Sequence, residues 1–239
     1  ALGENKPDKK MDDALRHLFL DTFIDELKWI EEGSESPIER LFCTAVLLVG
    51  KTRGHDLLCF TPIVDDQIEA YKQNLRNWLT SVEDLEHMLQ AQGGKPNELK
   101  RFIEHLVEQG QMDKEEAQEL LHYRMYGNLG YKEAFHVSQQ PRLPSMLRVG
   151  KHGIRPDLLV WVPNDPSFNL IVECDGYSYH GDKDSFTRDR KRDRFLKQSG
   201  YEVLRFSGSE INDDPLTVGV EFVDFLAKQR GLKSTNQPS

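Results

Sequence analysis

Two carboxylates, Asp157 and Glu173, lie at matching positions of two neighbouring apolar stretches, residues 155–162 and 169–180. A loop signal at residues 163–167 separates these stretches, and both are rich in β-branched, aliphatic and aromatic residues, which predicts a β-hairpin. If the hairpin is symmetric about this loop, Asp157 lies opposite Glu173, with Cβ atoms roughly 4.5–5.5 Å apart. Two opposed carboxylates are unfavourable unless a positive charge lies between them, and Mg²⁺ is held by carboxylates, waters and substrate phosphate. The pair therefore predicts a site for phosphoryl transfer or hydrolysis.

The same register places Arg155 opposite Asp175, and side chains alternate between the two faces along a strand. All four charged residues would then project from one face of the hairpin. The pattern also fits a surface hairpin with scattered acids, in which Arg155 and Asp175 form an ordinary cross-strand pair. A β-bulge would change the register, so the residues alone leave both interpretations open.

Several short motifs occur in an order that resembles the PD-(D/E)XK nuclease superfamily, and in particular its branch related to very-short-patch-repair endonucleases. The resemblance extends over residues 34–50 and 130–226 and leaves the middle of the chain unexplained. It rests on the order and spacing of the motifs taken together. These motifs are Ser36–Glu39, Arg155–Asp157, Ile171–Gly176, His180, Arg188–Asp193 and Gly200–Phe206.

This resemblance implies an α/β, restriction-endonuclease-like core, with a mixed sheet of about four strands flanked by helices. It implies hydrolysis of DNA phosphodiester bonds with Mg²⁺, or Mn²⁺ as an alternative. The metal ligands it implies are Asp157, Glu173 and the backbone carbonyl of Cys174. Glu39 is similar to the glutamate that many members carry on the first core helix, and it becomes a further candidate for metal binding or catalysis.

The sequence departs from the superfamily at one position, because Asp175 replaces the lysine of the final motif. In the branch named above this position is often not lysine, and a histidine five residues further on, His180 here, is a candidate general base. Arg155 or a basic residue of the 188–192 segment would then serve in place of the lysine. A histidine after a strand is also commonly a loop residue bonded to backbone, and the missing lysine leaves open a non-catalytic DNA-binding or protein-interaction module.

Glu39 has a second explanation that needs no metal. Ser36, Pro37 and Glu39 occupy the N-cap, first and third positions of a predicted helix, which is the pattern of a capping box. A glutamate in the first turn could also direct its carboxylate toward the sheet. The sequence leaves the two roles open.

A basic segment follows the hairpin. Residues 183–205 contain eight basic and four acidic residues, although the whole chain carries a net charge of −9. We expect this segment to face DNA phosphates, with Arg188, Lys191 and Arg192 as contacts together with Arg155. The alternative is a solvated helix held by ion pairs one turn apart.

The apolar periodicities predict the following organisation. Residues 1–33 form a polar tail and a helix, residues 34–61 and 128–230 form the nuclease-like core, residues 62–127 form an all-helical insertion, and residues 231–239 are disordered. Within these segments we expect a buried helix at 41–49, insertion helices at 68–79 and 82–89, a helix from 99, a helix capped by Asp113, a strand at 131–140, a basic loop at 141–151, a helix at 184–199, a strand at 201–206 and a closing helix at 216–226. The insertion could serve packing, target selection, homodimer formation or docking of a protein partner.

Composition limits the classes of function. A hydrophobic fraction of 38% and a charged fraction of 30% are typical of a globular protein, and no apolar run approaches the roughly 20 residues of a membrane span. No signal-peptide pattern opens the sequence, so we expect a cytoplasmic location. The pI near 5.4 argues against nonspecific coating of nucleic acid, but a nuclease needs only a local basic face. A phosphohydrolase for small nucleotides is less favoured, because nothing resembles a nucleoside pocket.

Overall fold

The computed structural model describes residues 22–52, 58–61, 68–95, 98–117, 120, 133–144, 147–149, 152–175 and 183–231. Five strands form a mixed sheet in the order β1-β2-β5-β6-β7, in which β1–β2 and β6–β7 are parallel and the two central pairs are antiparallel. The expected α/β class with a mixed sheet is therefore confirmed, with one strand more than expected. The strands are β1 (Leu58–Phe60), β2 (Phe135–Gln139), β5 (Leu158–Val162), β6 (Asp165–Asp175) and β7 (Glu202–Ser207).

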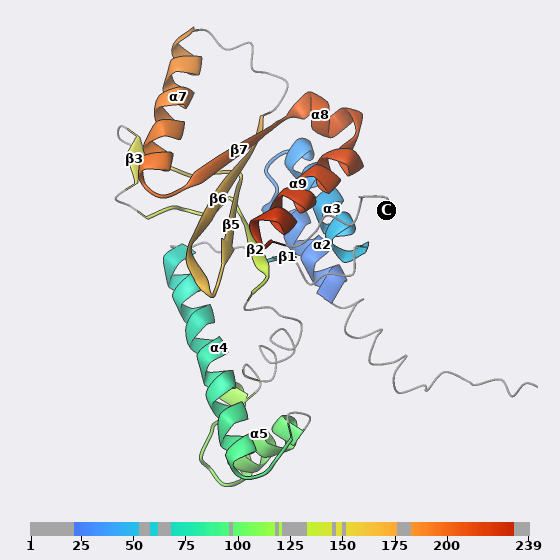
Figure 1. Ribbon diagram of the computed structural model, residues 1–239, viewed down its shortest axis with the longest axis vertical. Helices are drawn as coiled ribbons and strands as arrows, with labels where there is room; N and C mark the ends of the chain where they lie inside the picture. Colours follow the sequence, from blue (N-terminus) through green and yellow to red (C-terminus); the bar gives the residue numbers. More distant parts are fainter. Residues whose placement is uncertain are drawn as a thin grey trace, which may run out of the picture.

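Helices cover both faces of this sheet (Figure 1). One face packs against α2 (Thr22–Gly33), α3 (Pro37–Thr52), α8 (Gly208–Asp213) and α9 (Pro215–Gln229). The other face packs against α7 (Lys183–Gln198) and the N-terminal half of α4 (Ile68–Ala91). Alternation along the strands separates the two layers: Leu158 and Val172 point to the first, Leu159 and Ile171 to the second.

The register of the β5–β6 hairpin is the one that the sequence predicts. Leu158 pairs with Val172, and continuing this register by one residue places Asp157 opposite Glu173. A register shift does occur, but it lies at positions 161 and 162, next to the turn. The bulge therefore leaves the carboxylate end of the hairpin unchanged.

The helical region after β1 differs from its prediction. A single helix, α4, runs from Ile68 to Ala91 where two helices were expected, because no glycine or proline interrupts residues 79–82. Its second half packs with α5 (Leu99–Glu108) in a separate apolar cluster that includes Leu85, Leu89, Leu99 and Ile103. The predicted cap is confirmed, since Asp113 Oδ1 accepts the N–H of Glu116 at 2.8 Å.

Three further elements were not predicted. A small antiparallel pair, β3 (Arg148–Val149) and β4 (His152–Gly153), lies at the end of the basic loop predicted at 141–151, and α8 separates β7 from α9. The helix at 184–199 is confirmed as α7, and Gly200 follows it with a φ of 89°, which suits the glycine expected there. The start of the first predicted helix, before Thr22, and the tail from position 232 lie outside the described residues. Among the helices that are described, none is long and apolar enough to cross a membrane.

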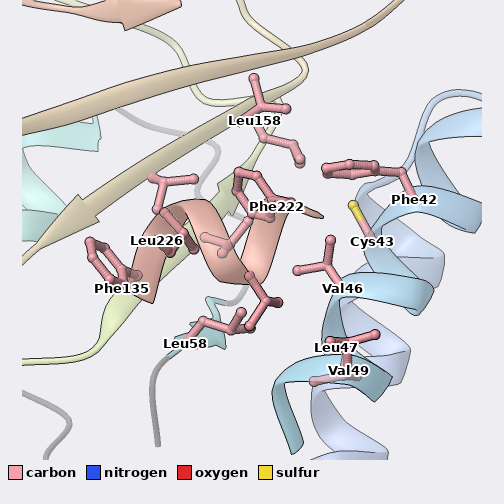
Figure 2. Packing of buried hydrophobic residues seen from close by; sticks show 14 of the residues in the cluster. Phe42, Cys43, Val46, Leu47, Val49, Leu58, Phe135, Leu158, Phe222 and Leu226 are labelled. Atoms are coloured by element: carbon pink, nitrogen blue, oxygen red, sulfur yellow. The ribbon is translucent and has the colours of Figure 1, made fainter. Parts of the chain in front are cut away.

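The largest apolar cluster joins α3 and α9 beneath the sheet (Figure 2). The ring of Phe42 lies 5.4 Å from that of Phe222 and 5.0 Å from that of Phe206. The two helices approach closely at Gly219, where a Cβ would lie 3.1 Å from the backbone carbon and oxygen of Ala45. Glycine at this position therefore allows the close approach of α9 to α3.

Replacing Gly219 with valine should force the two helices apart. We expect Gly219→Val to lower the free energy of unfolding by about 1–3 kcal/mol, the usual cost of overpacking a core, as measured by urea unfolding. Glu221→Val adds the same side chain on the exposed side of α9 and serves as the control. Equal losses in the two variants would show that the helices do not pack this closely.

Candidate active site

Asp157 lies just before β5, and the neighbouring strand fixes its carboxylate. Its Oδ2 accepts the backbone N–H of Cys174 at 2.7 Å, and its own carbonyl accepts the N–H of Gln140 at 2.8 Å. Burial raises the pKa of Asp157 above its ordinary value, the Cys174 N–H lowers it, and the negative charge of Glu39 raises it. Hydrogen bonds therefore offset only part of the free-energy cost of burying this carboxylate. The thiol of Cys174 belongs to the apolar core, so only its backbone is available to the site.

Glu173 is buried in β6, with 6% of its surface exposed. Its Oε1 forms an ion pair with the guanidinium of Arg192 from α7. Burial is the main cause that raises the pKa of Glu173 to about 7; Arg192 and Arg205 lower it, while Asp157 and Asp175 raise it. Asp157 and Glu173 therefore act on one another as like charges in a poorly hydrated place, as the hairpin register predicts.

Glu39 both caps a helix and approaches the carboxylate pair. The Ser36 hydroxyl accepts the N–H of Glu39 at 3.2 Å, which is the first half of the predicted capping box. The Glu39 carboxylate accepts the N–H of Glu35 at 3.0 Å and the side-chain amide of Gln140 at 2.8 Å. Gln140 also bonds to Asp157, so one amide links the two acids. The two interpretations of Glu39 are thus compatible.

Gln140 was not predicted as a site residue. It is buried, and its φ of 45° places a non-glycine residue in the left-handed region. Such a conformation costs free energy and persists where surrounding contacts hold it, here the bond from its N–H to Asp157. The sequence offered two signals: a polar residue at the end of a buried strand, and the resemblance to the nuclease superfamily, whose members often carry a Gln near this position.

Asp175 has a different partner from the one predicted. Arg205 of β7 donates from Nη1 to both oxygens of Asp175, at 3.0 and 3.3 Å, and from Nη2 to Asp193 of α7 at 2.8 Å. This bridge joins β6, β7 and α7. Neither Arg205 nor Asp193 was predicted to belong to the site, because their meeting depends on how α7 lies against the sheet.

Arg155 turns away from Asp175, so its predicted cross-strand pairing is wrong. Its Nε donates to the carbonyl of Gln140 at 3.1 Å, and its Nη1 forms an ion pair with Glu35. The reason is that residues 154–156 are not part of a strand, so the hairpin register does not extend to position 155. Arg155 therefore lies beside the start of α3.

Three predicted site residues lie after the hairpin, on α7, and one lies just before that helix. The last of these, His180, lies outside the described residues, and so does the side chain of Arg188. Lys191 is exposed on α7, whereas Arg192 is partly buried against Glu173.

The residues present fit a hard divalent cation at the pair of acids. Within the described part of the chain, no three His, Cys, Asp or Glu side chains gather as metal ligands. A cation held by Asp157 and Glu173 would rely on water and substrate oxygens for its other ligands, which is how Mg²⁺ is commonly bound. Burial, and to a smaller extent the negative charge of Asp157, raises the pKa of Glu173, and a bound cation would offset both effects.

One comparison with known proteins found a match. Residues 143–226 match the family model REase_MTES_1575, a restriction endonuclease-like family that fits the PD-(D/E)XK superfamily. The matched segment contains Asp157, Glu173 and Arg192 but not Glu39. The same comparisons found no matching curated protein and no matching solved structure. The fold is thus restriction-endonuclease-like, and the family match suggests nuclease activity.

The raised pKa of Glu173 gives a prediction for the metal-free protein. The folded-state pKa of about 7 exceeds the ordinary 4.5, so ionisation of Glu173 destabilises the fold as pH rises between these values, and the loss persists above them. Glu173→Gln should therefore be more stable than wild type at pH 8, by roughly 1–3 kcal/mol, and similar to it at pH 4.5. Urea unfolding in EDTA measures the difference. Glu202→Gln, at an exposed position of β7, is the control and should show no such gain; a Glu173→Gln variant without added stability at pH 8 contradicts the argument.

Proposed function

We propose that this chain is a DNA endonuclease that hydrolyses phosphodiester bonds with Mg²⁺, or with Mn²⁺ in its place. The observation that carries the proposal is the convergence of the buried carboxylate of Glu173 and the half-buried carboxylate of Asp157 at one end of a paired hairpin in a restriction-endonuclease-like sheet. The branch related to very-short-patch-repair endonucleases is the one we favour, because its members often lack the lysine that Asp175 replaces here.

Asp157 and Glu173 would hold the metal ion, with the backbone carbonyl of Cys174 as a third protein ligand. The bound ion would lower the pKa of a water molecule and offset the charge that develops on the phosphate. The N–H of Cys174 keeps Asp157 oriented before metal arrives, and Gln140 holds Glu39 beside the pair. We assign Glu39 to the outer part of the metal site and His180 to proton transfer or phosphate contact.

DNA would approach along the basic surface of α7. Lys191 is exposed there, and Arg188 and Arg190 lie on the same helix. Arg155 would contribute at the start of α3. Phosphate contacts of this kind position the nucleic acid and do not read its sequence.

The second candidate is a non-catalytic DNA-binding or protein-interaction module that keeps the nuclease fold. The observation in its favour is Asp175, whose carboxylate is bound by Arg205 where a catalytic lysine would stand. In this case the helical region 62–127, which we propose to be an insertion, would carry the contacts with a partner or with a second copy of the chain.

Substitution of the acids separates the two candidates. Asp157→Asn and Glu173→Gln should each abolish Mg²⁺-dependent nicking of supercoiled plasmid, by on the order of 1000-fold, because the ion supplies several kcal/mol of stabilisation. Both variants should still retain DNA in gel-shift assays with Ca²⁺. Asp213→Asn, at an exposed position of α8, is the control. Nicking that survives both substitutions would remove the site assignment, and retention without any nicking by wild type favours the second candidate.

The DNA-facing role of α7 has its own test. Lys191→Ala should weaken DNA binding without changing sequence preference and should reduce the salt dependence of the binding constant by about one unit of slope. Lys228→Ala removes an exposed lysine from α9, which covers the opposite face of the sheet, and should leave the slope unchanged. Equal slopes for Lys191→Ala and wild type would place the DNA elsewhere.

A further inference from the structure

An arginine occupies the place where the acid pair needs a cation. Arg192 extends from α7 to the Oε1 of Glu173, and its charge also lowers the pKa of Asp157. The side chain is 25% exposed, so it lies at the boundary between the buried Glu173 and solvent. A guanidinium carries five N–H donors and keeps its charge at any physiological pH, and the contact with Glu173 uses Nη2. Its contact with this described residue therefore leaves donors for a second oxygen-bearing partner.

A polar bridge fixes the position of this arginine. Among the α7 side chains that the structure describes, Leu196 is the one that is fully buried, so apolar contacts alone hold the helix weakly. Arg205 supplies a second attachment, because it binds Asp193 of α7 with one nitrogen and Asp175 of β6 with the other. Asp193 is the neighbour of Arg192. The bridge thus sets the distance between Arg192 and the strand that carries Glu173.

We propose that Arg192 is the cation that contacts the substrate in this site. In the metal-free protein Arg192 is bound by Glu173. When a metal ion binds the Glu173 carboxylate, Arg192 moves to the scissile phosphate, and Arg205 positions it for this contact. This inference rests on the proposed nuclease function. A divalent ion at Asp157 and Glu173 supplies the charge that Arg192 supplies beforehand, and the two cations repel one another at such a distance. A phosphate brings new negative charge and matches the planar fork of the guanidinium. Arg192 therefore faces a negatively charged oxygen in both states.

If Arg192 moves from Glu173 to the phosphate when metal binds, the loss of Arg192 should affect metal affinity and cleavage rate differently. Arg192→Gln removes a competitor of the metal, so Mn²⁺ should bind at least as tightly as in wild type. The plasmid cleavage rate at saturating Mn²⁺ should fall about 100-fold, the usual effect of losing one donor to a developing charge. Arg192→Lys keeps the charge and should recover part of the rate. Electron paramagnetic resonance of free Mn²⁺ gives the dissociation constant at pH 8.5 without reference to activity.

The controls separate positioning from folding. Lys228→Gln removes an exposed cation from α9, on the opposite face of the sheet, and should change neither quantity. Asp193→Asn breaks one end of the Arg205 bridge and should slow cleavage about 10-fold in the wild-type background, but not in Arg192→Gln, because positioning has no effect without the residue that is positioned. Thermal unfolding of each variant verifies that it is folded.

The outcomes distinguish this inference from the proposed function. If wild type binds Mn²⁺ through Asp157 and cleaves DNA, but Arg192→Gln cleaves at the wild-type rate or loses Mn²⁺ affinity along with activity, then the exchange is wrong and the nuclease assignment stands. If Asp193→Asn slows Arg192→Gln as much as wild type, the positioning role of Arg205 is wrong. If wild type neither cleaves nor shows Mn²⁺ binding that depends on Asp157, the proposed function fails and this inference fails with it.

Discussion

The enclosure of two like charges by the β5–β6 hairpin is the constraint on which the rest of the site depends. Burial makes an ionised carboxylate costly, and a second carboxylate beside it makes it costlier still, which is why the pKa of Glu173 rises to about 7. A fold that served stability alone would separate the two acids or neutralise them. This chain keeps them together and offsets the cost with a backbone N–H on Asp157 and a guanidinium on Glu173.

The two layers of helices have different tasks around this constraint. The α3–α9 layer is a tightly packed apolar core with aromatic contacts around Phe42 (Figure 2). The two helices also approach closely at Gly219. On the other face, the described part of α7 contributes one fully buried apolar side chain, Leu196, and ion pairs through Arg192 and Asp193 attach the helix to the sheet. The tightly packed layer therefore fixes the strands, while ion pairs hold the helix that presents the basic surface. This division suits a site in which side chains must change partners, since ion pairs exchange more readily than packed side chains.

The sequence predicted the parts of the site that depend on local periodicity. The two-residue period of side chains along each strand, together with the position of the loop, was sufficient to place Asp157 opposite Glu173. The bulge lies next to the turn and does not change the register at these two residues. The same reasoning failed for Arg155, because the strand ends before that residue. It also could not find the bridge through Arg205, since the orientation of a helix against a sheet is a tertiary property. Gln140 was missed because its conformation depends on contacts with residues distant in the sequence.

The central claim is that Asp157 and Glu173 share one metal ion. Anomalous diffraction from crystals soaked with Mn²⁺ tests it most directly. The account predicts a single strong peak between the two carboxylates, with the side chain of Arg192 displaced from Glu173. A peak elsewhere on the protein, with Arg192 still paired to Glu173 at saturating Mn²⁺, would contradict it.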